Sequence, residues 1–294
     1  LSNLLIEELD LSQINFNGNT LTLQCKQLNK IVGSETFNGS LFLLPKDCRL
    51  TEFTLEGISN IQGDFQCIDY FYVKEFVMPF IRVAGDMTIA LNSGSVNTAA
   101  EIEFPKLQEI GGTLTLGTNR NANNITFPLL KKILGSCSVT TYKLKNDIEF
   151  TNLESIGTDG ADAQIKFEIE ATNILCPKLK TINGKFDIAT SSFMFDMEVD
   201  KVSYPNVESI SENLSITCPY SDFGSNGILS IDFSGLKSAK GISISGQGDV
   251  TDFSSFKYLF ENNVLTGESQ WSVKECGYNP TFQEMKDGKY KLAE

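Results

Sequence analysis

The chain has 294 residues, and 41% of them are hydrophobic, a fraction typical of a folded protein. Acidic residues outnumber basic ones by 37 to 24, so the chain lacks the positive footprint of a nucleic-acid-binding protein. There is no histidine, which excludes Ser/His/Asp and Cys/His nucleophilic catalysis. We find no stretch of roughly 18 apolar residues and no signal-peptide pattern, so the N-terminus reads as the interior of a longer protein.

Residues 1–20 carry scattered apolar side chains at Leu9, Leu11, Ile14 and Phe16, without a regular pattern. The first unit of a repetitive fold exposes its core and its sheet edge unless another segment covers them. We therefore expect residues 1–20 to form an N-terminal cap, or alternatively a linker to a preceding domain.

A repeated motif begins after residue 20 and is clearest at 102–116. Its recurring positions are Ile102, Phe104, Pro105, Leu107, Ile110, Gly112, Leu114 and Leu116. Each copy holds two short stretches of period 2, the pattern of a strand with one buried face. The first apolar position advances from 102 to 125, 148, 174, 202 and 231, in steps of 23, 23, 26, 28 and 29. Because one copy cannot bury its own apolar face, the copies must stack as a parallel β-solenoid.

The less regular copies are placed by the same motif. At the start, Leu23 and Cys25 take the places of Ile102 and Phe104, and Gly33 takes the place of the glycine. Residues 157–163 interrupt one copy and are expected to form an inserted turn. We expect one all-β solenoid domain over residues 1–294, with rungs over 21–260 and a C-terminal cap over 261–294.

Three kinds of motif residue have a separate physical role. Proline suits the end of the first strand, because it has a fixed φ and no N–H donor. Glycine before the second strand predicts a corner with positive φ, and Glu212, which replaces it once, predicts a different turn there. The aromatic position predicts an internal ladder formed by Phe104, Phe127, Phe150, Tyr204 and Phe233.

Seven cysteines are present: Cys25, Cys48, Cys67, Cys137, Cys176, Cys218 and Cys276. The chain has neither a CxxC motif nor a histidine to complete a mixed zinc site. Cys25, Cys67, Cys137 and Cys176 fall on apolar motif positions, which favours free thiols used as small core side chains. A disulfide between stacked rungs remains an alternative, because spacing alone cannot assign one.

The C-terminal segment contains the only tryptophan and leaves the repeat. We expect Trp271, Tyr278 and Phe282 to cover the last rung, since the end of a solenoid must be capped. An aromatic binding site is the alternative interpretation.

Acidic side chains provide the only candidates for catalysis or for a metal site. Glu101 and Glu103 alternate on one predicted strand, and Asp159 and Asp162 lie in the inserted turn. A pair of carboxylates suits glycoside hydrolysis, and oxygen ligands on a loop suit calcium. Solvated surface charges are the simpler explanation, so we expect no catalytic residues, no metal and no cofactor.

The outward positions of the second strand are small and polar. We select six of them as candidate ligand-binding residues: Thr113, Thr115, Ser136, Ser138, Asn213 and Ser215. Asp86 and Thr88 lie in the same predicted rows. Hydroxyl and amide groups in a row can form many weak hydrogen bonds with a partner.

The repeat resembles the receptor L domain and related leucine-rich-repeat surface proteins. The C-terminal sequence, with Trp271-Ser272-Val273, then Tyr278-Asn279-Pro280-Thr281 and Gly288-Lys289-Tyr290, is similar to the end of repeat-containing cell-surface lipoproteins of Bacteroidetes type. A fungal group of wall proteins has similar rungs. The resemblance implies a right-handed solenoid with irregular rungs of about 23–30 residues and end caps.

The same resemblance implies a non-enzymatic binding or adhesion module on the cell surface. Its partner would be a host or bacterial surface protein or a glycan, and not a nucleic acid. A lipid anchor outside this chain would hold it at the outer membrane. A carbohydrate-active enzyme on a β-helix scaffold and a purely structural surface spacer are the alternative functions.

Overall fold

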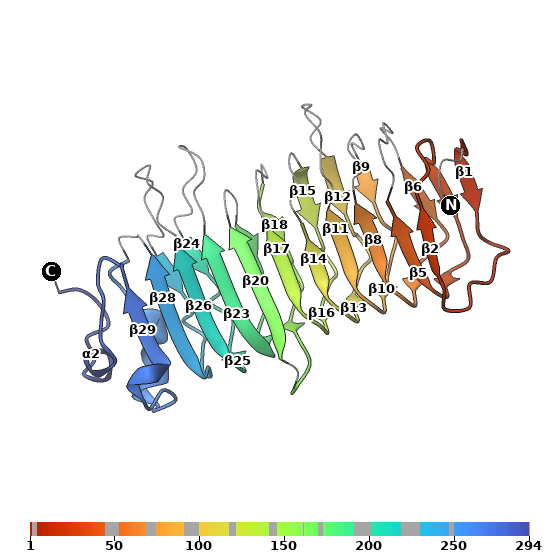
Figure 1. Ribbon diagram of the computed structural model, residues 1–294. Coiled ribbons are helices and arrows are strands. Elements are labelled where there is room, and N and C mark those ends of the chain that lie inside the picture. The colour runs from red at the N-terminus through yellow and green to blue at the C-terminus, as the bar shows by residue number, and fades with distance from the viewer. Residues whose placement is uncertain are drawn as a thin grey trace.

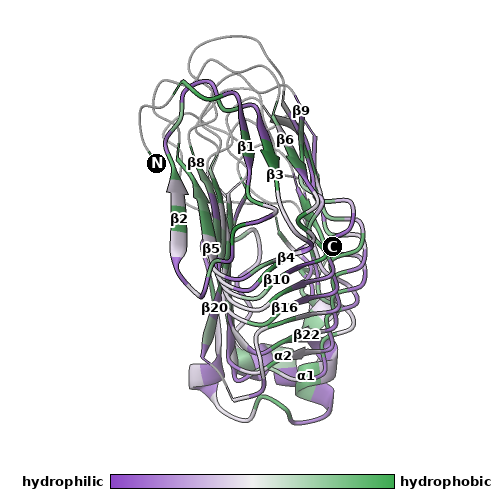
Figure 2. Ribbon diagram, turned by 90° about the vertical axis from the view of Figure 1, so that its right-hand side faces the viewer, coloured by the Kyte–Doolittle hydropathy of each residue, from purple (hydrophilic) through white to green (hydrophobic). Residues whose placement is uncertain are grey.

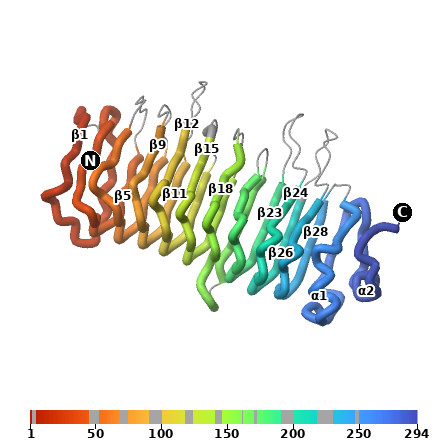
Figure 3. Tube along the Cα trace, turned by 180° about the vertical axis from the view of Figure 1, so that it is seen from behind, coloured from red at the N-terminus to blue at the C-terminus, as the bar shows by residue number. Residues whose placement is uncertain are grey.

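The computed structural model describes residues 1, 5–44, 53–68, 75–90, 100–117, 122–140, 146–160, 162–169, 173–190, 201–218, 230–246 and 250–293. Over these ranges the chain winds into stacked coils with strands on three sides, and the coils advance in sequence order from one end to the other (Figures 1 and 3). The predicted all-β solenoid is confirmed.

The long face is a sheet of eleven strands, all paired in parallel within the described chain. Its strands are β2 (Thr20–Leu23), β5 (Ser40–Leu43), β8 (Phe65–Ile68), β11 (Met87–Ala90), β14 (Leu114–Leu116), β17 (Cys137–Thr140), β20 (Ala163–Ile169), β23 (Gly184–Thr190), β26 (Asn213–Cys218), β28 (Gly241–Gly246) and β29 (Trp271–Lys274). These are the second strands of the repeated motif.

The ridge face is an eight-stranded parallel sheet with only two residues in each strand. Its strands are β4 (Thr36–Phe37), β7 (Asn60–Ile61), β10 (Arg82–Val83), β13 (Glu109–Ile110), β16 (Lys132–Ile133), β19 (Ser155–Ile156), β22 (Thr181–Ile182) and β25 (Ser209–Ile210). They correspond to the motif position of Ile110.

The split face holds the first strands of the motif and is divided into three separate sheets in the described chain. One sheet contains β1 (Glu8–Asp10), β3 (Lys30–Val32) and β6 (Thr54–Glu56). The next contains β9 (Glu75–Val77), β12 (Ala100–Glu103), β15 (Ala122–Thr126), β18 (Ile148–Glu149) and β21 (Ile174–Leu175). The last contains β24 (Lys201–Ser203) and β27 (Ser230–Asp232).

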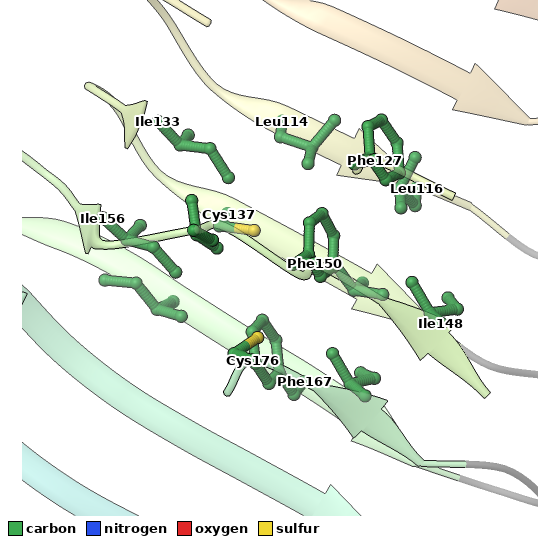
Figure 4. Close-up of a cluster of buried hydrophobic side chains, with 14 of the residues drawn as sticks. Leu114, Leu116, Phe127, Ile133, Cys137, Ile148, Phe150, Ile156, Phe167 and Cys176 are labelled. Atoms are coloured by element: carbon green, nitrogen blue, oxygen red, sulfur yellow. The ribbon is translucent and has the colours of Figure 1, made fainter. Parts of the chain in front are cut away.

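Side chains from the three faces fill one continuous apolar core between the sheets. The rings of Phe104 and Phe127 stack with centroids 4.9 Å apart, and those of Phe127 and Phe150 with centroids 5.0 Å apart. In Figure 4, Cys176 occupies the next place, so the predicted aromatic ladder is interrupted there. Tyr204 and Phe233 approach again with centroids 5.7 Å apart and tilted rings.

Four of the cysteines behave as core residues. Cys25, Cys137 and Cys176 are buried free thiols, as predicted, Cys67 is also buried, and Cys276 is less buried. Burial raises the pKa of the Cys137 thiol far above its usual range, so its sulfur stays neutral. Cys48 and the side chain of Cys218 lie outside the described residues.

The corner glycines of the motif do not adopt positive φ, so the predicted reason for them is wrong. They form a ladder between coils: the Gly112 N–H donates to the Gly85 carbonyl at 2.9 Å, and the Gly135 N–H donates to the Gly112 carbonyl at 3.0 Å. A Cβ on Gly112 would lie 2.7 Å from the Gly85 carbonyl carbon. At Gly112 the close approach of the adjacent coil, and not dihedral freedom, therefore explains the glycine.

Glu212 continues this ladder, with its N–H 3.3 Å from the Gly184 carbonyl. Its backbone carbonyl accepts from the Lys240 N–H at 2.9 Å, and its carboxylate also pairs with the Lys240 ammonium. The last corner is therefore Lys240, whereas Gly241 pairs in register with Asn213. This register explains why the second strand of that copy begins one residue early.

The prediction assigned the first copy of the motif to the wrong strands. Leu21 pairs with Leu41 on the long face, and Ile31 pairs with Leu55 on the split face. Leu21 therefore corresponds to Leu114, not to a position before Ile102. A complete coil formed by β3, β4 and β5 was missed, because both kinds of strand have period 2 and Gly33 resembles a corner glycine.

The two ends differ from the predicted caps. Residues 8–10 stack in parallel on β3, so part of segment 1–20 belongs to the first coil. At the other end, β29 extends the stack to Lys274, beyond the predicted boundary at residue 260. The end of the expected rung range 21–260 is instead helical, in the 3-10 helix η1 (Ser254–Phe256) and α1 (Lys257–Glu261).

The C-terminal cap closes over Trp271. A second 3-10 helix, η2 (Glu268–Gln270), precedes β29, and α2 (Phe282–Lys286) follows it. Trp271 is buried, its ring lies 5.1 Å from that of Phe260, and its Nε1–H donates to the Pro280 carbonyl at 2.8 Å. The indole therefore has a structural role in the cap, as expected from the sequence.

Candidate functional site

The outer surface of the long face carries one aligned row of side chains at the centre of its strands. Strand register places eleven residues in this middle row: Thr22, Phe42, Gln66, Thr88, Thr115, Ser138, Lys166, Asp187, Ser215, Ser243 and Ser272. Their neighbours along each strand, such as Leu114 and Leu116, point into the core. Successive row members lie about 4.8 Å apart, the spacing of paired strands.

The six candidate residues from the sequence lie on this surface in two groups. Thr115 and Ser138 are neighbours in the middle row, and Thr113 and Ser136 precede them at the corner with the ridge face. Asn213 and Ser215 also face outward on β26. The coils of β20 and β23 separate the two groups, so the candidates do not form one continuous patch.

On the outer surface of the long face, β20 and β23 carry four charged side chains, Lys166, Glu168, Lys185 and Asp187, which we call the charged band. Lys166 pairs with Glu168, and the Lys185 ammonium lies 2.9 Å from the Asp187 carboxylate. The hydrogen bond from Lys166 lowers the pKa of Glu168, and the Thr140 hydroxyl also donates to this carboxylate at 2.8 Å. The alternation of Lys166, Phe167 and Glu168 indicates this band in the sequence, although none of its residues is among the six candidates.

Residues at the corner beside the middle row contribute to the stacking of the coils. The Asp86 N–H donates to the Asp64 carboxylate at 2.8 Å, and the Thr113 N–H donates to the Asp86 carboxylate at 2.7 Å. The Gln164 N–H donates in the same way to the Ser136 hydroxyl at 3.0 Å. Ser136 thus has a structural bond to the next coil, and the middle row is the better candidate for contacting a partner.

The carboxylates considered for catalysis lie in different parts of the solenoid. Glu101 and Glu103 belong to β12 on the split face, where the Asn124 side-chain amide donates to Glu101 at 2.8 Å. Asp159 and Asp162 are exposed at the turn before β20. Ala161, in the same turn, lies outside the described residues. Among the residues that the structure describes, no group of three or more Cys, Asp or Glu side chains could hold one metal ion.

A cavity of about 120 Å³ lies at the break in the split face between β21 and β24. Ile169, Asn173, Leu175 and Lys201 are among its lining residues. Most of the residues that line the cavity belong to β21 and β24 of the split face, so the cavity lies apart from the middle row.

Comparisons of the chain with protein-family models, curated proteins and solved structures found no match. The likeness to receptor L domains and surface lipoproteins thus depends on the sequence motifs alone. No helix in the described ranges has the length and apolar character needed to cross a membrane.

Proposed function

We propose that this protein is a non-enzymatic binding or adhesion module of the cell surface that presents its long face to a protein or a glycan. The observation that supports this proposal is the middle row, in which eleven outward side chains stay in register along the solenoid. A surface of this length suits an extended partner better than a small molecule.

The chemistry of the row favours many weak contacts. Thr88, Thr115 and Ser138 are consecutive hydroxyl residues on adjacent strands, and each hydroxyl can donate and accept. The backbone amides beneath them are engaged in the parallel ladder, so the side chains present the polar groups. Repeated weak contacts with one extended partner add up through multivalency.

The charged band divides the middle row into two segments of uncharged residues. Six row members from Thr22 to Ser138 precede it, and Ser215, Ser243 and Ser272 follow it. We expect the longer segment to provide most of the contacts. The charges of Lys166 and Asp187 would fix the position of a partner along the solenoid axis.

The proposal is tested on glycan and surface-protein arrays with the whole chain. We expect binding above background, and a loss of about tenfold or more when Thr115→Lys and Ser138→Lys are combined, because two long charged side chains would stand in the contact surface. The matched control combines Thr181→Lys and Ser209→Lys, which are neighbours in register on the ridge face.

Two results would contradict the proposal. Absence of array binding by the wild-type chain would favour a structural spacer, and equal loss in both double variants would place the contact elsewhere. Surface location and a lipid anchor are part of the same proposal. They are tested by metabolic lipid labelling of the full-length gene product and by protease accessibility on intact cells.

A further inference from the structure

The two ends of the solenoid are unlike. At the C-terminal end, α1 and α2 cover the last coil, and the ring of Phe260 packs against Trp271 and Phe282 with centroids 5.1 and 5.5 Å away. At the other end, β1 is the outermost strand of its sheet among the described residues. Figure 2 looks onto this end and shows β1 beside β3 and β6.

The backbone of β1 presents an edge that no described strand occupies. Its inner side is bonded to β3: the Lys30 N–H donates to the Glu7 carbonyl at 3.1 Å and the Leu11 N–H donates to the Val32 carbonyl at 2.7 Å. Alternate residues of a parallel strand direct their N–H and C=O groups to opposite sides. The backbone groups of Glu8 and Asp10 therefore face away from the stack, and no described strand pairs with them. Such an edge is a template for an added strand.

Apolar side chains lie in the segments that precede and follow β1 in the sequence. Leu5 is 78% exposed just before β1, and Ile14 is 49% exposed in the segment that follows it. Behind them, Leu9 and Phe16 are only partly buried against the core. A cavity of about 230 Å³ lies nearby, with Leu11, Ile14, Phe16, Ser34 and Thr36 among its lining residues. An added strand would therefore gain apolar contacts as well as backbone hydrogen bonds.

The charges on the edge select the occupant. Glu8 and Asp10 flank Leu9, and the Lys30 ammonium lies 3.7 Å from Glu8 and 3.4 Å from Glu56, so it is shared between two carboxylates. A second copy paired antiparallel about Leu9 would place Glu8 opposite Asp10, which is destabilising. Charged residues on an edge strand oppose self-pairing in this way. A strand with Lys or Arg at alternate positions would instead meet opposite charges.

We propose that the free edge of β1 receives an extended, basic segment of another polypeptide by strand addition. The edge supplies the backbone hydrogen bonds, Leu5 and Ile14 supply apolar contact, and Glu8 and Asp10 supply the charge preference. This site is separate from the long face and does not depend on the function proposed for it.

The test uses isothermal titration of the whole chain with two blocked hexapeptides, one alternating Lys and Val and one alternating Glu and Val. We expect the Lys/Val peptide alone to bind, with deuterium exchange slowing at Glu8 and Asp10. Glu8→Pro removes the outward N–H without removing a bond to β3, and should weaken binding about tenfold or more. Combining Glu8→Lys with Asp10→Lys should reverse the peptide preference. The matched control, Glu103→Lys with Glu149→Lys, changes the same net charge in the middle of the split face and should bind like the wild type.

The proposal is overturned if the Lys/Val peptide does not bind. It is also overturned if the control loses binding as much as the edge variants, because the attraction would then reflect only the overall negative charge. A concentration-dependent dimer that Glu8→Pro abolishes would identify a second copy as the occupant instead. Circular dichroism checks that each variant is folded, and the exchange at Glu8 and Asp10 in the wild type tests the edge independently of any substitution.

Discussion

The hydroxyl of Tyr204 donates to the backbone carbonyl of Ile174 at 3.0 Å, inside the core and across the break between β21 and β24. Within each sheet of the split face the strands are joined by backbone bonds, such as Phe150 N–H to the Leu175 carbonyl at 2.9 Å. The Tyr204 N–H instead bonds forward to Asp232, at 2.8 Å. The tyrosine hydroxyl thus provides a side-chain link where the backbone ladder stops.

Removing this hydroxyl should destabilise the fold. Tyr204→Phe leaves the Ile174 carbonyl without this donor, and an unsatisfied buried acceptor costs about 1–3 kcal/mol. The measurement is the free energy of unfolding in urea. Tyr258→Phe is the matched control, because Tyr258 is 39% exposed, and it should unfold like the wild type. Equal stability of Tyr204→Phe and the wild type would show that the link contributes nothing.

A methyl group at a corner glycine should force adjacent coils apart. In Gly112→Ala the new Cβ would lie 2.7 Å from a backbone carbon of the preceding coil, which cannot move without disturbing the ladder. We expect a loss of about 1–3 kcal/mol or more, as for other overpacked sites. Gly267→Ala is the control, since its nearest neighbour would be 3.9 Å away. The measurement is the midpoint of thermal unfolding, which should be lower for Gly112→Ala than for Gly267→Ala. Equal midpoints for the two variants would contradict this prediction.

The buried thiols should be unreactive in the folded protein. Only thiolates react readily with iodoacetamide, and burial both raises the pKa of Cys137 and blocks access to its sulfur. Peptide mass spectrometry should find Cys25, Cys67, Cys137 and Cys176 unmodified under native conditions and modified in urea. Cys276, which is less buried, should react first among the described cysteines. Native labelling of Cys137 at the rate of Cys276 would indicate that the core opens locally.

The charged band should contribute to stability in a pH-dependent way. The pKa of Glu168 is lowered from 4.5, mainly by the hydrogen bond from Lys166, so folding favours the ionised carboxylate. The pair should therefore stabilise the fold above pH 4.5, and the contribution should disappear as the pH falls through the lower folded-state pKa.

Urea titrations of Glu168→Gln and the wild type at pH 7 and pH 3 measure this contribution. The Glu168 side chain is 37% exposed, so water screens the pair and the difference at pH 7 should stay below about 1 kcal/mol. The difference between the two proteins should be smaller at pH 3 than at pH 7. A difference that grows toward low pH would have the wrong sign for a depressed carboxylate pKa.

The sequence by itself determined the local alternation and the repeated core. Ile102, Phe104 and Leu114 alternate with other residues at a period of 2, so each strand has one apolar face. A single copy cannot bury that face, so the stacking of copies was predictable. Burial of the four motif cysteines followed from the same positions. Thr115 and Ser138 were recognised as outward neighbours for the same reason.

Only the tertiary structure decided which face each copy occupies and what lies across a coil boundary. Leu21 has the same period as Ile102, so its place on the long face became visible only through its pairing with Leu41. The charged band, the Tyr204 link and the free edge of β1 all depend on residues about 20 to 30 positions apart, or on a missing neighbour. Side-chain alternation carries no information on these relationships, because they are set by the register and closeness of adjacent coils.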